Sequence, residues 1–61
     1  MKYAELHRIL IQNGWIRVQG KGKGSHVWYV KHGKYCVVPY HGSHEISIGL
    51  AKKILKDIGI K

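Results

Sequence analysis

Apolar residues recur at helical spacing in the first part of the chain. Positions three and four residues apart share one face of an α-helix. The residues on that face are Leu6, Ile9, Leu10 and Asn13. We therefore expect a helix over Lys2–Asn13, which Gly14 ends because glycine adopts the left-handed conformation that follows many helices.

The same spacing returns near the other end of the chain. The apolar stripe there consists of Leu50, Ile54, Leu55 and Ile58. It predicts a helix from about Ile48 to Ile58, with Ser47 as its N-cap and Gly59 as its stop. The opposite face carries Lys52, Lys53 and Lys56. We expect this face to be solvated, and the alternative is a second contact to a phosphate backbone.

Three stretches between the helices have the pattern of strands. Trp15–Gln19 alternates, with Ile16 and Val18 on one side, and predicts a first strand. Ser25–Lys31 is rich in Val, Trp and Tyr, and a short turn at 32–34 leads into a third stretch at 35–38. Pro39 cannot donate to a ladder and should close that third strand.

This order predicts an α+β fold, α-β-β-β-α, formed by residues 1–61 as a single domain. Short connections favour a three-stranded antiparallel sheet, and both helices must cover one face of it to bury their stripes. A chain of 61 residues buries only about 60% of the surface that its unfolded form exposes, so a deep substrate cavity is not expected. An enzyme of this size should act on a polymer that lies across its surface.

The second strand leaves open which face of the sheet is buried. One side carries His26, Trp28 and Val30, and the other carries Val27, Tyr29 and Lys31. Both sets contain large apolar groups. Trp28 is therefore either a core residue or an exposed ring that could stack on a nucleic-acid base.

The charge is strongly one-sided. Eleven Lys and Arg residues stand against three Asp and Glu, which gives a formal charge of +8, and no acidic residue lies between Glu5 and Glu45. Such a surface favours phosphate backbones or an acidic protein partner, although it could also serve only solubility. Cys36 is the single cysteine, so an intramolecular disulfide is excluded, and we expect it to be a small buried hydrophobe. With neither a signal peptide nor a membrane span in the sequence, a cytosolic, non-membrane protein is expected.

A glycine-rich loop leads into the second strand. Gly20, Gly22 and Gly24 permit positive φ and expose backbone N–H groups, while Lys21 and Lys23 supply charge, a combination that suits a phosphate. His26 follows directly after Gly24 and Ser25, and histidine exchanges a proton near neutral pH. The simpler interpretation is a flexible hairpin loop with a surface histidine.

The order of motifs resembles the HicA family. The motifs that carry the resemblance are Gly24-Ser25-His26 with the apolar strand after it, Val-Val-Pro-Tyr-His-Gly at 37–42, Glu45-Ile46 and the basic helix that closes with Gly59. The resemblance covers essentially the whole chain, from the opening helix to Gly59-Ile60. HicA proteins are small RNA-cleaving toxins of bacterial toxin–antitoxin pairs. The resemblance implies a double-stranded-RNA-binding-domain-like fold, activity against mRNA or other single-stranded RNA, and a HicB-type antitoxin as partner. Gly49-Leu50-Ala51 departs from the usual Gly-Thr-Leu, while Gly-Ser-His is intact.

On this basis we expect a metal-independent endoribonuclease that needs no cofactor. His26 would be the general base on a ribose 2′-hydroxyl, and Lys21, Lys23, Gly24, Ser25 and Trp28 would bind the RNA. The sequence does not identify the general acid, for which His41 and water are the candidates. The alternative function is a non-catalytic nucleic-acid-binding module of the same fold.

The remaining histidines carry weaker expectations. His41 and His44 with His26 or Cys36 could be imagined as zinc ligands, but zinc sites usually draw paired ligands from two places in the chain. No metal site is therefore expected. His7 and His32 are expected to be surface residues.

Overall fold

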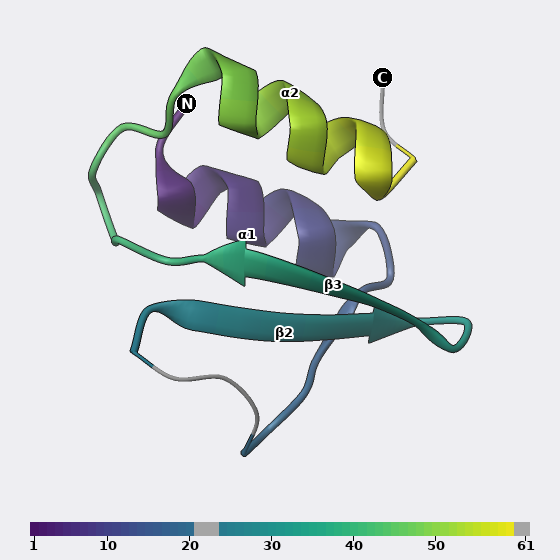
Figure 1. Ribbon diagram of the computed structural model, residues 1–61. Coiled ribbons are helices and arrows are strands. Elements are labelled where there is room, and N and C mark those ends of the chain that lie inside the picture. Colours follow the sequence, from purple (N-terminus) through teal and green to yellow (C-terminus); the bar gives the residue numbers. More distant parts are fainter. Residues whose placement is uncertain (21–23, 60–61) are drawn as a thin grey trace.

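The structure is a computed structural model that describes residues 1–20 and 24–59 (Figure 1). The predicted order α-β-β-β-α is confirmed. The elements are helix α1 at Tyr3–Gln12, strands β1 at Ile16–Arg17, β2 at His26–Lys31 and β3 at Lys34–Pro39, and helix α2 at Ile48–Asp57.

The three strands form one antiparallel sheet in the order β1-β2-β3. β2 is therefore the central strand. Val27 pairs with Val38 across the β2–β3 hairpin, and Trp28 pairs with Val37 on the opposite side of the sheet. Pro39 is the last residue of β3, as its missing N–H predicts.

Both helices lie on the same side of the sheet (Figure 1), which confirms the predicted layering. The face that they cover carries Val27, Tyr29 and Val38, because Tyr29 and Val38 belong to the buried core and Val27 packs against it. The rest of the core comes from the two helical stripes and the segments beside them. These residues are Leu6, Leu10, Trp15, Ile46, Ala51, Ile54 and Ile58.

The end of α1 explains why the first strand is shorter than predicted. Gly14 has φ of +87°, its N–H donates to Ile11 O, and the Trp15 N–H donates to Leu10 O at 3.0 Å. This pattern is a Schellman motif. The Trp15 amide is thus used by the helix and not by the sheet, so the strand expected over Trp15–Gln19 begins at Ile16. It ends at Arg17, with one further bond from Val18 N to Trp28 O.

The loop between β3 and α2 satisfies the start of α1. Tyr3 N–H donates to His44 O and Ala4 N–H donates to Gly42 O, so two amides that a helix leaves without internal partners are bonded to this loop. The start of α2 follows the prediction, since Ser47 Oγ accepts a hydrogen bond from Leu50 N–H at 3.3 Å. The two helices therefore begin on a shared, hydrogen-bonded segment.

Neither helix in the described part of the chain has the length and hydrophobicity that crossing a membrane requires.

Candidate active site

His26 is the first residue of β2 and is exposed. It lies opposite Pro39 and shares a face with Trp28, on the side of the sheet away from the helices. Trp28 is half-buried but lies outside the core, and its ring meets that of Tyr35 edge to face at 6.1 Å between centroids. The structure thus decides the question that the sequence left open: His26, Trp28 and Val30 are on the open face.

The backbone holds the start of β2 in place. Tyr40 N–H donates to Ser25 O at 2.7 Å, which extends the β2–β3 pairing by one residue. Gly24 has φ of +59° and space for a Cβ around it, so the left-handed backbone rather than crowding requires glycine there. The predicted phosphate contacts Lys21 and Lys23, together with Gly22, lie outside the described residues.

The open face is apolar as well as exposed. We define it by Ile16, His26, Trp28, Val30, Tyr35 and Val37. Ile16 is 67% exposed, Tyr35 52% and Val37 39%. Exposed apolar side chains that gather on one face of a small domain indicate an interaction surface.

The position of His7 differs from the one predicted from the sequence. It was expected on the surface but is only 8% exposed. Its ring hydrogen-bonds Tyr29 Oη through Nδ1 at 2.6 Å and Pro39 O through Nε2 at 2.8 Å. Because a carbonyl only accepts, Nε2 carries the proton and Nδ1 of the neutral ring accepts from the tyrosine hydroxyl. Burial lowers the pKa of His7, and the nearby Arg17 charge acts in the same direction against the Pro39 hydrogen bond.

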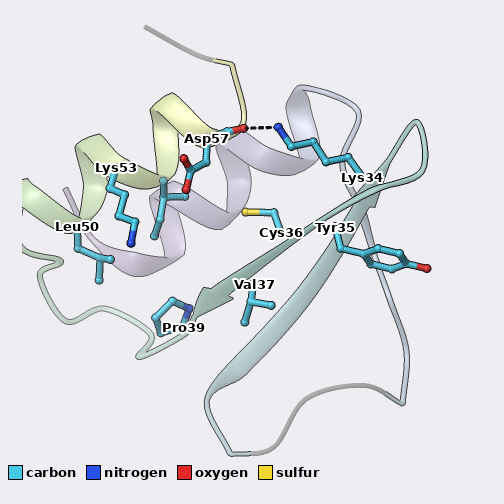
Figure 2. Close-up of a pocket in the computed structure, with 9 residues that line it drawn as sticks. Lys34, Tyr35, Cys36, Val37, Pro39, Leu50, Lys53 and Asp57 are labelled. Atoms are coloured by element: carbon cyan, nitrogen blue, oxygen red, sulfur yellow. Dashed lines mark hydrogen bonds between the residues drawn. The ribbon is translucent and has the colours of Figure 1, made fainter.

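Hollows lie beside the sheet, and two of them bear on the site. One, of about 370 Å³, lies on the helix side and is lined by His7, Arg17, Val27, Tyr29 and Tyr40. The other, of about 250 Å³, lies between β3 and α2 (Figure 2) and carries none of the predicted RNA-binding residues. Figure 2 shows the Lys34 ammonium bonded to Asp57 O across one end of this groove.

Cys36 also lines the groove between β3 and α2. It is partly buried and packs against the core, close to the buried hydrophobe that was expected. Burial raises the pKa of its thiol, and the Asp57 carboxylate adds to the effect.

The other histidines are exposed and differ in their surroundings. The His41 ring meets Tyr3 edge to face at 4.9 Å, and His44 accepts a bond at the start of α1 through its backbone oxygen. His32 lies in the β2–β3 turn with φ of +50°. Within residues 1–20 and 24–59, no three His, Cys, Asp or Glu side chains gather as a metal site would require.

All three acidic residues lie outside the sheet. Glu45 pairs with the Met1 ammonium at 3.1 Å, and Glu5 accepts a bond from Lys2 N–H. Asp57 is at the end of α2. The strands and the loop before His26 therefore contribute only positive and neutral side chains, as the acid-free interval of the sequence indicates.

Comparisons with known proteins agree on one family. A sequence model described as the HicA toxin of bacterial toxin-antitoxin matches residues 3–60. A curated protein of Pseudomonas fluorescens (strain Pf0-1), named probable mRNA interferase HicA, is 42% identical over 65 residues. That alignment covers 100% of this chain and 98% of the relative. No solved structure shows significant similarity to the chain.

Proposed function

Because the chain belongs to the HicA family of bacterial toxins, we propose that it is an endoribonuclease that cleaves mRNA or other single-stranded RNA with His26 as general base. The observation that carries the assignment is the place of His26, exposed on the open face at the start of the central strand, directly after Gly24 and Ser25. A polymer can reach this position without entering a cavity. The relative named probable mRNA interferase HicA supports the activity.

The RNA supplies its own nucleophile in this mechanism. His26 takes the proton of a ribose 2′-hydroxyl, and the resulting oxygen attacks the adjacent phosphorus while the bond to the 5′-oxygen of the next nucleotide breaks. That oxygen receives a proton from His41 or from water. The products are a 2′,3′-cyclic phosphate and a 5′-hydroxyl, and no metal takes part. Positioned proton transfer contributes roughly 10²–10⁴-fold to such a rate.

Neighbouring groups bind and polarise the phosphate. Gly24 and Ser25 lie beside His26, and Lys21 and Lys23 precede them in the sequence. Amides and cations fixed before the reaction stabilise the charge that develops on the phosphate oxygens. Trp28 lies two residues beyond His26 on the same face, where stacking on a base would be worth about 1–3 kcal/mol.

The open face also fits a protein partner, which we infer to be a HicB-type antitoxin. The family description places the toxin in a toxin–antitoxin system. The exposed Ile16, Tyr35 and Val37 offer apolar area on the same face of the sheet as His26, and the net charge of +8 favours an acidic partner. A protein seated there covers His26, so RNA and antitoxin compete. If saturating antitoxin left the affinity for an uncleavable RNA unchanged, inhibition by masking would be refuted.

The activity is tested with end-labelled RNA in excess chelator, beside a His26→Ala control. Cleavage should persist with chelator, leave 2′,3′-cyclic phosphate termini and disappear in the variant. Loss of cleavage with chelator would refute the metal-independent mechanism, and equal cleavage by His26→Ala would refute the general base. RNA binding without any cleavage would instead support a nucleic-acid-binding module of the same fold.

A further inference from the structure

The cavity on the helix side of the sheet has no role in the function proposed above. Its volume of about 370 Å³ lies within the range of small-molecule sites. It is lined from three directions, by His7 of α1, by Arg17, Val27 and Tyr29 of the sheet, and by Tyr40 just after β3. His7 accepts a hydrogen bond from the Tyr29 hydroxyl and donates one to Pro39 O, which holds these lining residues in place.

The cavity lies beside the strand end that carries His26. Tyr40, which lines it, is bonded through its N–H to Ser25 O, and Ser25 immediately precedes His26. Because side chains alternate along a strand, Val27 faces the cavity while His26 faces the open side. His26 and the cavity therefore lie near the same end of the sheet, on its two opposite faces.

The chemistry of the lining fits a nucleotide. Arg17 is exposed and supplies a planar cation that can bind two phosphate oxygens at once. Tyr40 is 45% exposed, and its ring is held by an edge-to-face contact with His7 at 4.9 Å, so an aromatic surface is available for a base. No acidic side chain lines this cavity among the described residues.

We propose that this cavity is a second RNA subsite, which holds a nucleotide flanking the cleaved bond with its phosphate at Arg17 and its base against Tyr40. The inference rests on the proposed ribonuclease function and adds to it the path of the substrate. The RNA then contacts the protein on both faces of the sheet, at Trp28 on the open face and at Tyr40 on the helix side. Binding strength should depend on both rings.

The test is RNA binding by His26→Ala protein, measured by fluorescence anisotropy over a range of salt concentrations. The probe is a labelled single strand of about 12 nucleotides, within the usual site sizes for such proteins. Adding Tyr40→Ala should weaken binding at least about fivefold, whereas Tyr40→Phe keeps the ring and the affinity. Adding Arg17→Ala should lower the magnitude of the salt slope by about 0.7, as loss of one phosphate contact predicts.

Two controls separate this inference from the proposed function. Lys56→Ala removes one charge from α2, which does not line the cavity, so it should weaken binding less than Arg17→Ala does. An RNA carrying 5-iodouridine should cross-link to Tyr40 in protein whose cavity is unaltered, so this measurement does not depend on how the variants fold. Unchanged affinity and salt slope in folded Arg17→Ala and Tyr40→Ala, or cross-links to the open face alone, would overturn the subsite. Absence of RNA binding by both wild type and His26→Ala would overturn the proposed function itself.

Discussion

Replacing His7 with phenylalanine should strongly destabilise the fold, although the new ring fills a similar volume. The change removes the acceptor of the Tyr29 hydroxyl and the donor to Pro39 O, and Tyr29 is only 3% exposed. A buried polar group left without its partner costs about 1–3 kcal/mol. We expect a loss of about 2–4 kcal/mol. At roughly 0.05–0.15 kcal/mol per residue, that is a large part of the stability of a 61-residue domain.

The loss should also depend on pH in a definite direction. Burial holds the pKa of His7 in the folded state below the usual value of 6.5, so the unfolded chain takes up the proton first as the pH falls. The contribution of His7 is complete above pH 6.5. It declines below that value by at most about 1.4 kcal/mol per pH unit, until the folded state is protonated as well. The difference in free energy of unfolding between wild type and His7→Phe should therefore shrink in acid.

Urea unfolding followed by tryptophan fluorescence measures this difference, since Trp15 is buried in the folded state. The experiment runs at several pH values for wild type, His7→Phe, Tyr29→Phe and the double variant. The sum of the stability losses in the two single variants should exceed the loss in the double variant, because each single variant removes the same His7–Tyr29 hydrogen bond. Additive losses, or a difference between wild type and His7→Phe that is constant from neutral to acid pH, would refute the buried neutral pair.

Three further predictions concern the loop and the thiol. Lys21→Ala with Lys23→Ala should weaken RNA binding for all sequences and flatten its salt dependence, and an unchanged salt slope would show that the loop does not touch phosphate. Gly24→Ala should cost about 1–2 kcal/mol in urea unfolding, because φ is +59° there, while Gly49→Ala in α2 should be neutral or stabilising; equal losses would contradict this. Cys36 should react with iodoacetamide at pH 8 more slowly than glutathione does, since burial raises its pKa, and an equal rate would contradict the packing.

The sequence predicts the elements well because each has a local cause. The stripes of the two helices, the Ser47 cap and the stop at Pro39 follow from spacing and from single residues. The start of the first strand cannot be predicted in this way, because the Trp15 amide could bond either to the sheet or to the end of α1. Only the folded chain decides between these partners.

The site is less predictable than the fold, since it depends on contacts between distant segments. The face that the helices cover could not be chosen while Trp28 and Tyr29 were equally apolar. The prediction that His7 lies on the surface was wrong because it was based on the polar character of histidine. The position of His7, three residues before Leu10, places it on the buried side of the helix. Its partners Tyr29 and Pro39 are far along the chain, so the spacing to Leu10 was the one available signal. Phosphate binding by the loop lysines and general-base catalysis by His26 stay predictions.

The central position of β2 limits how the proposed catalytic strand can move. β2 is paired with β3 along its full length and with β1 only at Tyr29 and Val30, so the hairpin with β3 provides most of the bonds that hold it. Local opening starts where few bonds hold a segment, which in this sheet is the two-residue β1. Amide hydrogens of β2 that bond to β3 should exchange only on global unfolding, and those that face β1 should exchange sooner. His26 lies at the end of β2 that β1 does not reach, so its backbone position depends on the hairpin with β3, through the pairing with Pro39 and the bond from Tyr40 N–H to Ser25 O.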